Sequence, residues 1–460
     1  MALGGTQALL FSVAPHNLIS YIIPATHPSR GVARAIVLVH GLCFGFYRVA
    51  LNDTREDLEN FVIDVILHNK RGLRASLCRV VFLGLSKIFA SGASLRLWLY
   101  DKRLMRDHHL GVPVISIGNL TVGGTGKTPV VELFARTLRD KGRTVAILSR
   151  GYKSKADAKP PLWKRFGATF GLVKKPQRPP PRIVSDGVEV LLDSHLSGDE
   201  PWMLASNLKG VPVLVDRNRV KAGKLAIKQF HVDALLLDDG LQYLKLKRRL
   251  DIVLVDRTAP FGNGYMLPRG TLREPARNLR RASYIFITKS DENPNDELIA
   301  LLRKYNRVAE IVECRHRPVY FKDMHTGQRM EITEIKGKYV GSLSGIAVPE
   351  SFENGLRKLG AKIEATARFA DHHRFSDKEL MQFHERCVRK DLEYIVTTEK
   401  DIVRFPHLPR LDIPIIYMRV EIEILRGQEV FDKLIKIITE PRAVPPGVLV
   451  PVNLNAAVDR

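Results

Sequence analysis

The chain has 460 residues, 45% hydrophobic and 26% charged, which is the composition of an ordinary globular protein of two or three domains. Its four cysteines are scattered, without a C-x-x-C pair or metal-like spacing, so we expect neither a cysteine-built metal site nor a disulfide framework. The formal net charge of +23 suits a polyanionic partner, which could be a nucleic acid, an anionic membrane surface or a phosphorylated ligand.

Two different segments precede the first predicted domain. Residues 1–60 form an N-terminal extension that we leave unassigned, and the apolar run at 35–47 is too short for a bilayer span of about 20 residues. Residues 61–110 contain apolar side chains at helical spacing, surrounded between 71 and 105 by basic and aromatic ones. This pattern predicts an amphipathic helical segment in a membrane interface, with packing on the protein's own core as the alternative.

From Val112 onward the pattern is α/β. Short, continuous apolar runs alternate with helical segments, the first of them at 128–141. Such runs predict a mainly parallel sheet with helices on both faces. The glycine-rich stretch "GNLTVGGTGKTPV" between the first run and the helix at 128–141 makes this fold P-loop NTPase-like. The runs expected to be strands are "VPVISIGN", "TVAILSRG", "VPVLVD", "ALLLDDG", "DIVLVD", "SYIFITKSD", "YVGSLSGI", "EYIVTTEKD" and "IPIIYMRV".

The expected domain organisation follows from these runs. A P-loop core domain covers 111–317, a β-hairpin linker covers 318–338, and a second, smaller α/β domain covers 339–445, before a tail at 446–460. The Lys- and Pro-rich stretch at 153–182 is expected to be an exposed loop, because its composition does not support a regular element.

The stretch "GNLTVGGTGKTPV" resembles a phosphate-binding loop between a strand and a helix, with Thr121 where the usual pattern has glycine. Glycines let backbone N–H groups converge on an anion, a lysine faces the terminal phosphates, and a hydroxyl holds Mg²⁺. Lys127 and Thr128 supply the last two groups, and the following helix adds its dipole. We expect the nucleotide to be bound by Thr121, Val122, Gly123, Gly124, Thr125, Gly126, Lys127 and Thr128.

The partner of this loop is predicted in "DALLLDDGLQ". An apolar strand ending in Asp238 and Asp239 would place carboxylates beside the phosphate loop, where one or both can hold Mg²⁺. Asp256 ends a similar strand, but a lone aspartate at a strand end is more often a turn residue or a helix cap. The doubled carboxylate is therefore the predicted metal site.

Two smaller groups of polar residues have ordinary interpretations when taken alone. Asp199 and Glu200 stand in a Gly/Pro-framed turn ahead of a helix, where an N-cap is the common role. Asp371, His372 and His373 follow one another, and histidines with satisfied partners at a protein surface are the commoner case. These interpretations weaken only when the segments are taken together with the phosphate loop.

Seven stretches occur together and in the order known from one family. The sequence strongly resembles the tetraacyldisaccharide 4'-kinase family over roughly residues 75–440, and that family shares the threonine-led phosphate loop. Tyr243 is a departure, because the family often has histidine there. The stretches are "VPVISIGNLTVGGTGKTPVVE", "SRGY", "GDEP", "DDGLQ", "LPRGTLREP", "DHH" and "TEKD".

The resemblance implies a reaction and roles for its residues. ATP would pass its γ-phosphate to the 4'-hydroxyl of an acylated glucosamine disaccharide 1-phosphate, giving lipid IVA in lipid A biosynthesis. Asp199 matches the family's catalytic base and His372 the histidine paired with it, while Asp238 and Asp239 match the metal-associated pair, with Glu200 as an accessory.

The resemblance also implies a place in the cell. The lipid substrate lies in a membrane, so we expect peripheral or monotopic association with the cytoplasmic face of the inner membrane in a bacterium that has an outer membrane. The rival interpretation is a P-loop GTPase or metal-insertion chaperone, based on "TKSD" at 288–291, which fits a guanine-reading pattern. We expect no nucleic-acid partner, because the sequence contains no stacking-aromatic module or helix-turn-helix pattern.

Overall fold

The computed structural model does not describe every residue of the chain. Our expectations for the extension at 1–60, for most of the basic loop at 153–182 and for the tail at 446–460 lie outside the described residues. The structure describes residues 61–62, 64–66, 70–151 and 179–440.

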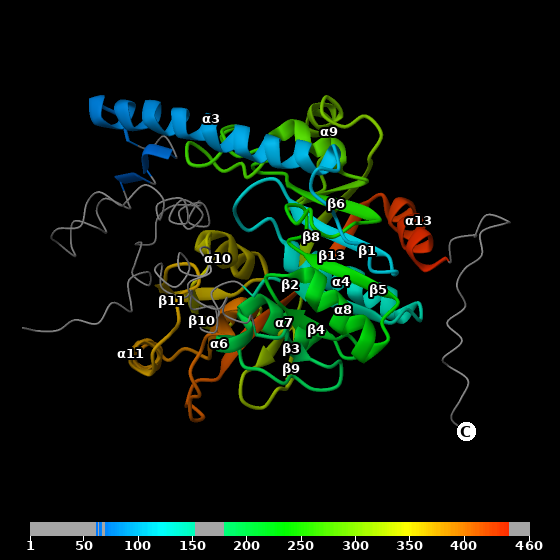
Figure 1. Cartoon of the computed structure of the whole chain (residues 1–460). Helices are drawn as coiled ribbons and strands as arrows, with labels where there is room; N and C mark the ends of the chain where they lie inside the picture. Colours follow the sequence, from blue (N-terminus) through cyan, green and yellow to red (C-terminus); the bar gives the residue numbers. More distant parts are fainter. Residues whose placement is uncertain (1–60, 63, 67–69, 152–178, 441–460) are drawn as a thin grey trace, which may run out of the picture.

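The described residues build one 13-stranded sheet (Figure 1). Its order is β11-β10-β12-β13-β8-β7-β6-β1-β5-β2-β4-β3, with β9 paired to β8. Most neighbours are parallel, and only the pairs β3–β4, β8–β13 and β8–β9 are antiparallel among them. The strands are β1 (Val114–Asn119), β2 (Val145–Ser149), β3 (Arg182–Ser185), β4 (Val213–Val215), β5 (Ala234–Asp238), β6 (Leu250–Asp256), β7 (Tyr284–Thr288), β8 (Glu310–Asp323), β9 (Arg329–Glu331), β10 (Tyr339–Ser344), β11 (Lys362–Arg368), β12 (Tyr394–Thr398) and β13 (Ile415–Arg426).

Helices cover the sheet on both faces, which confirms the predicted α/β fold (Figure 1). The helix expected at 128–141 is α4. The α-helices are α3 (Leu73–Asp101), α4 (Lys127–Asp140), α6 (Ser194–Ser197), α7 (Asp199–Asn207), α8 (Arg219–Phe230), α9 (Asp296–Arg303), α10 (Pro349–Lys358), α11 (Asp377–Val388), α12 (Glu399–Ile402) and α13 (Gln428–Thr439), and the 3₁₀-helices are η3 (Ala276–Arg281) and η4 (Ile332–Ile335).

The apolar strands are explained by this double coverage. In β1, Ile115 and Ile117 join the core cluster that contains side chains of α4, α7 and α13, whereas Val114 joins the cluster that contains α8. Neighbouring side chains of a strand point to opposite faces, so a strand covered on both sides has a nearly continuous run of apolar residues. The sheet therefore places the carboxyl end of β1 at a fixed point between two packed layers.

The second half of the chain continues the same sheet. The long strand β8 pairs antiparallel with β13 and turns back into β9 as a hairpin. Separate apolar clusters pack on the two faces of β10 and β12, one around Phe383 and one around Phe352. The division into two domains joined at 318–338 stays a prediction, because the sheet itself is continuous.

Helix α3 lies along one edge of the molecule (Figure 1) and docks through one of its faces. The hydroxyl of Ser86 donates to the carbonyl of Met266 at 3.0 Å, and Phe89 packs against buried apolar side chains of the core. The opposite face carries apolar side chains that are exposed, such as Leu77 and Ile88. By length and composition α3 is also long and apolar enough to cross a membrane, and 11% of its most apolar window is buried.

Candidate active site

The predicted phosphate loop joins β1 to the first turn of α4. Gly126 caps the helix with a left-handed backbone, φ 77°, and a Cβ there would lie 2.4 Å from the ring of His316. Both constraints require glycine at this position. The loop therefore delivers the N-terminus of α4, with its partial positive charge, to the carboxyl end of β1.

Polar contacts hold the lysine of this loop at the strand end. Lys127 Nζ donates to Asn119 Oδ1 at 3.3 Å and lies 3.8 Å from Asp239 Oδ1. Asn119 Nδ2 donates to Thr125 Oγ1 at 2.9 Å, which joins the two ends of the loop. The neighbouring Thr128 is buried. Lys127 is thus placed between the loop and the carboxylates of β5.

The first residues of the loop rest on the segment that contains "LPRGTLREP". Val122 N donates to the carbonyl of Thr271 at 2.8 Å, and Thr121 forms an isolated antiparallel bridge with Leu272. Thr121 is itself buried, so the position that departs from the usual glycine is a packed structural contact.

The two neighbouring carboxylates at the carboxyl end of β5 differ in their partners. Asp238 pairs with Ile117 in the register of the sheet, and its Oδ2 accepts from Ser149 Oγ at 3.0 Å. Asp239 has a left-handed backbone, φ 52°, and both of its carboxylate oxygens accept from Arg273, at 2.8 and 2.9 Å. Sequence reasoning missed Arg273, although it lies inside one of the stretches shared with the family.

The different partners separate the two pKa values. Burial, followed by the charges of Glu200 and Asp239, raises the pKa of Asp238 to about 7. Burial alone would also raise the pKa of Asp239, but Arg273 and Lys127 outweigh it and hold that pKa well below its usual range. At neutral pH the site therefore contains one fixed carboxylate and one that exchanges a proton.

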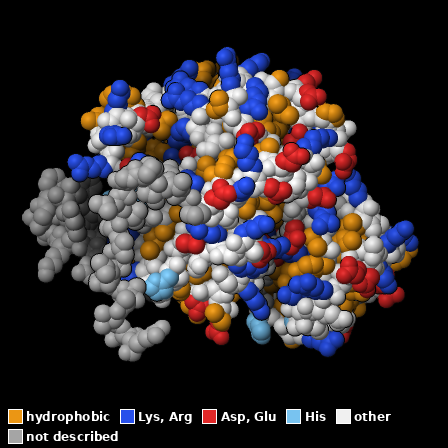
Figure 2. All heavy atoms as spheres, turned by 90° about the vertical axis from the view of Figure 1, so that its right-hand side faces the viewer, with side chains coloured by type: hydrophobic (Ala, Val, Ile, Leu, Met, Phe, Trp, Pro, Cys, Tyr) orange, Lys and Arg blue, Asp and Glu red, His pale blue; other side chains and the backbone are white. Residues whose placement is uncertain are grey.

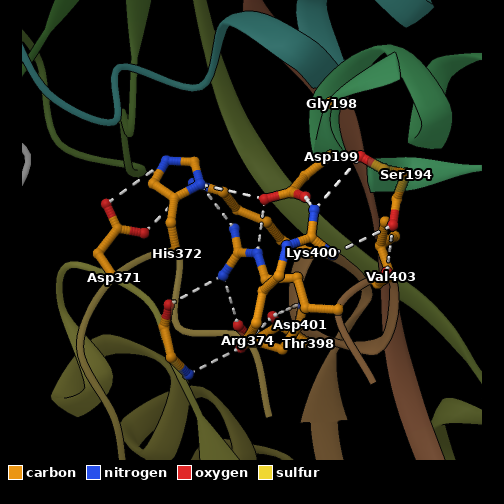
Figure 3. A network of polar contacts seen from close by, with 12 residues as sticks. Ser194, Gly198, Asp199, Asp371, His372, Arg374, Thr398, Lys400, Asp401 and Val403 are labelled. Carbon is orange, nitrogen blue, oxygen red and sulfur yellow. Dashed lines mark hydrogen bonds and ion pairs between the residues drawn. The ribbon is translucent and has the colours of Figure 1, made fainter. Parts of the chain in front are cut away.

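The predicted pair of Asp199 and His372 is brought together from two distant parts of the chain (Figure 3). Asp199 Oδ2 lies 3.2 Å from His372 Nδ1. Asp199 is the first residue of α7, yet the helix has no side-chain cap, so the N-cap interpretation does not describe this carboxylate. His372 has a left-handed backbone, φ 63°, which is strained for a non-glycine residue and is a common feature of functional sites.

Two arginines that sequence reasoning missed contact the same carboxylate. Arg404 Nε donates to Asp199 Oδ2 at 2.8 Å and Arg374 Nη2 to Oδ1 at 3.1 Å. Burial would raise the pKa of Asp199, but the charge of Arg404 and its hydrogen bond outweigh this and hold that pKa well below its usual range. Burial and the nearby Lys400 lower the pKa of His372 to about 4, so its ring is neutral at physiological pH.

The remaining sequence candidates have other partners. His373 stacks on Phe369, with ring centroids 4.8 Å apart, and its Nε2 lies 3.1 Å from the carboxylate of Glu379, as expected of a satisfied histidine. Asp256 Oδ1 accepts from both the backbone and the hydroxyl of Thr258, which is a turn contact.

The comparisons with known proteins point to one family. A family model described as "Tetraacyldisaccharide-1-P 4'-kinase" matches residues 78–167 and 174–439. A tetraacyldisaccharide 4'-kinase of Anaeromyxobacter dehalogenans (strain 2CP-C) is 39% identical over 353 residues, which cover 75% of this chain and 86% of that relative. One of Syntrophus aciditrophicus (strain SB) is 36% identical over 363 residues, covering 76% and 90%.

The chain belongs to the tetraacyldisaccharide 4'-kinase family. Among solved structures, LpxK of Aquifex aeolicus in complex with ATP is 27% identical, with a TM-score of 0.60 over 79% of this chain and 99% of that one. The family model spans the phosphate loop, Asp199, Asp238, Asp239 and His372, so every catalytic and metal candidate lies inside the matched residues.

Proposed function

We propose that this kinase transfers the γ-phosphate of ATP to the 4'-hydroxyl of tetraacyldisaccharide 1-phosphate and so produces lipid IVA. The observation that supports this most directly is that phosphate-binding and proton-accepting groups belong to one site. Glu200, the neighbour of Asp199 in α7, lies close enough to Asp238 for its charge to raise the pKa of that carboxyl. The phosphate side and the acceptor side therefore lie within electrostatic range of each other.

On the phosphate side, the chain offers positive charge where the transferred group develops negative charge. Lys127 and the N-terminus of α4 converge on the carboxyl end of β1, and Arg273 stands beside them. Phosphoryl transfer depends mainly on positioning and on electrostatic stabilisation of the equatorial oxygens. We assign Lys127 to the terminal phosphates and the backbone of residues 121–128 to the remaining phosphate oxygens.

On the acceptor side, Asp199 receives the sugar hydroxyl. Its low pKa keeps it negatively charged at neutral pH, so it accepts a hydrogen bond from the hydroxyl and aligns the oxygen for in-line attack. A carboxylate of low basicity takes the proton late, which suits a loose transition state in which the attacking oxygen forms little bond. His372, neutral and beside Asp199, supports this orientation.

The donor set at the end of β5 fits Mg²⁺, which prefers oxygen ligands. Asp238 Oδ1 is buried and has no hydrogen-bond partner, so a buried carboxylate oxygen is left for a cation. Asp239 is less available because Arg273 occupies both of its oxygens. We propose Asp238 and the hydroxyl of Thr128 as ligands, with Glu200 as an accessory; the ion would neutralise charge on the nucleotide phosphates.

Membrane association is supported by α3. Leu77, Ile88 and Trp98 are exposed and lie on the side of the helix opposite the face that docks on the core. A helix docked along one face cannot be surrounded by lipid, so we propose that α3 lies in the interface, where basic side chains beside it meet anionic headgroups. Exposed basic residues of this segment are Arg74, Lys87, Arg96, Lys102 and Arg103.

The distribution of charge is compatible with this orientation. Figure 2 shows Lys and Arg interspersed with Asp and Glu over most of one face, and gathered more densely along the upper rim, at the height of α3 and α9 in Figure 1. Since the substrate is a membrane lipid and ATP is cytoplasmic, we propose the cytoplasmic face of the inner membrane of a bacterium with an outer membrane as the place of action.

The GTPase interpretation has little support from the residues on which it depends. Asp291, which would read guanine, forms an ion pair of 2.5 Å with Arg257 and accepts from the backbone of Asn293. Lys289 forms an ion pair with Asp256. The "TKSD" segment is therefore engaged in contacts within the protein.

The proposed reaction is tested by incubating the full chain with ATP and tetraacyldisaccharide 1-phosphate in detergent micelles. We expect ATP-dependent formation of a product phosphorylated at the 4'-position, and none in the Lys127→Ala variant. Nucleotide hydrolysis that does not depend on the lipid, or an activity supported by GTP and not by ATP, would contradict the proposal.

A further inference from the structure

Arg404 is a buried cation with all of its nitrogen atoms engaged. Its side chain is 0% exposed, and Nε donates to Asp199 Oδ2 at 2.8 Å. Nη2 lies 3.1 Å from His372 Nδ1, and Nη1 donates to Asp401 Oδ1 at 3.0 Å. One guanidinium group thus contacts both members of the proposed catalytic pair.

The guanidinium is itself held in place by Asp401. The second oxygen of Asp401 accepts from the backbone N–H of Gly345 at 3.0 Å and from the hydroxyl of Thr398 at 2.7 Å. Arg404 Nη1 also donates to the carbonyl of Gly345 at 3.2 Å. These contacts anchor Arg404 to the ends of β10 and β12, so its orientation is set by the second half of the sheet.

The contact with His372 determines which ring nitrogen carries the proton. A guanidinium can only donate, so a hydrogen bond from Arg404 to the neutral ring requires Nδ1 to accept and leaves the ring proton on Nε2. Nδ1 therefore cannot at the same time donate to Asp199, although the two atoms are 3.2 Å apart. In this structure Arg404 contacts both Asp199 Oδ2 and His372 Nδ1 and so bridges the two side chains.

The other arginine at the site differs from Arg404. Arg374 also reaches Asp199, but its side chain is 37% exposed, and its further contacts are with Ser194. A partly exposed arginine can turn away to admit a substrate. Arg404 cannot turn away in this manner, because its side chain is buried and each of its nitrogen atoms contacts a protein group.

We infer that Arg404 is a positioning residue of the transfer reaction, which fixes the Asp199 carboxylate and the His372 ring in one geometry and places the ring proton on Nε2. The inference rests on the proposed function, since it takes Asp199 as the residue that receives the acceptor hydroxyl. Lysine cannot replace this arginine, because one ammonium group cannot reproduce a planar fork that donates in three directions.

The kinetic test compares Arg404→Lys, Asp199→Ala and the double variant in the micelle assay. We expect Arg404→Lys to lower kcat about 10- to 100-fold, as misplacement of reacting groups does, with less than a threefold change in KM for ATP. The kcat of the double variant should lie within threefold of the kcat of Asp199→Ala, because Arg404 acts through Asp199. If the loss of kcat in the double variant equals the product of the two single losses, the inference is overturned.

A spectroscopic test measures the tautomer of His372 directly in the wild-type protein. With ¹⁵N-labelled histidine, and His372→Gln to assign the signals, we expect a pyrrole-like Nε2 and a pyridine-like Nδ1 for His372 at pH 7.5. Arg404→Lys should shift this ring toward a mixture of tautomers. A wild-type ring with its proton on Nδ1 would overturn the inference.

The control is Arg143→Met, which removes an arginine that lies 3.3 Å from Asp233 at the amino ends of β2 and β5. It should affect melting temperature but leave kcat within twofold. If Asp199→Ala loses activity while Arg404→Lys keeps full kcat, only the role of Arg404 is wrong. If Asp199→Ala keeps full kcat, the proposed base is wrong and the role of Arg404 is overturned with it.

Discussion

Asp199 and His372 are separated by 173 positions in the chain, yet their side chains meet at 3.2 Å. Asp199 begins a helix on the first half of the sheet, and His372 follows β11 at its far edge. The site is therefore complete only when the two halves are packed together. A change that separates them should remove activity without touching either residue, which is the expected behaviour of a site that closes around its substrates.

The phosphate loop gives the first prediction. Lys127→Ala should lower kcat at least 10²-fold, because the lysine stabilises charge on the transferred phosphate, an effect typically of several kcal/mol. The side chain is 18% exposed and its polar partners are Asn119 and Asp239. Because Asp239 keeps its two hydrogen bonds from Arg273, the melting temperature should change little. Kinetics beside melting curves check both statements. A folded variant with near-normal turnover would remove Lys127 from the mechanism.

The loop and its helix could be predicted from sequence because their signals are local. An apolar run, a glycine-rich turn and a lysine stand next to one another between Val114 and Thr128, and the structure places them as β1 and α4. The strand β11, by contrast, was not predicted. It lies at the edge of the sheet with several exposed positions, so "KIEATAR" carries no continuous apolar run.

The parts of the site that sequence reasoning missed are contacts between distant segments. Arg404 lies 205 positions from Asp199, and Arg273 lies 34 positions from Asp239. An arginine in isolation has no pattern that distinguishes a buried partner from a solvated surface charge. Only the fold shows that Arg404 is buried.

The metal site gives a prediction that separates two neighbouring carboxylates. Asp238→Asn should weaken Mg²⁺-dependent activity, and added Mg²⁺ should partly restore it, because the free oxygen of Asp238 is the proposed ligand. Asp239→Asn should lower activity, and added Mg²⁺ should restore little of it, since the main role of Asp239 is to hold Arg273 and Lys127. Mg²⁺ titrations of both variants decide this. Asp256→Asn is the matched control and should keep the wild-type response.

The pKa of Asp238 gives a prediction of pH dependence. The carboxyl titrates at about 7, and only its ionised form binds a cation. As pH falls from 8 to 6, protonation should therefore raise the Mg²⁺ concentration for half-maximal rate about tenfold. Asp238→Asn has no such proton to lose and should show a flat requirement. An equal shift in wild type and variant would assign the effect to another group.

The exposed face of α3 gives a prediction about membranes. Changing Leu77, Ile88 and Trp98 to Ser should move the protein from the membrane pellet to the soluble fraction, because each buried apolar side chain contributes about 1.5 to 3 kcal/mol. Turnover in detergent micelles should stay near normal, since the docked face is unchanged. Val188 and Val308, exposed apolar residues elsewhere, serve as matched Ser controls. Unchanged pelleting of the triple variant would place the anchor in another segment.

The last prediction concerns the catalytic pair itself. Asp199→Ala and His372→Ala should each lower kcat about 10²- to 10⁴-fold, the usual extent of general base catalysis, with a much smaller change in KM for ATP. Because His372 acts through Asp199, the double variant should be scarcely slower than the slower single variant. If Asp199 were only a structural carboxylate, its removal would leave Nε of the buried Arg404 without an acceptor, lower the melting temperature and change kcat little. Its effect would then add to that of His372→Ala. Kinetics of the two single variants and the double variant, with melting curves for each, distinguish these outcomes, and additive losses would reject the pair.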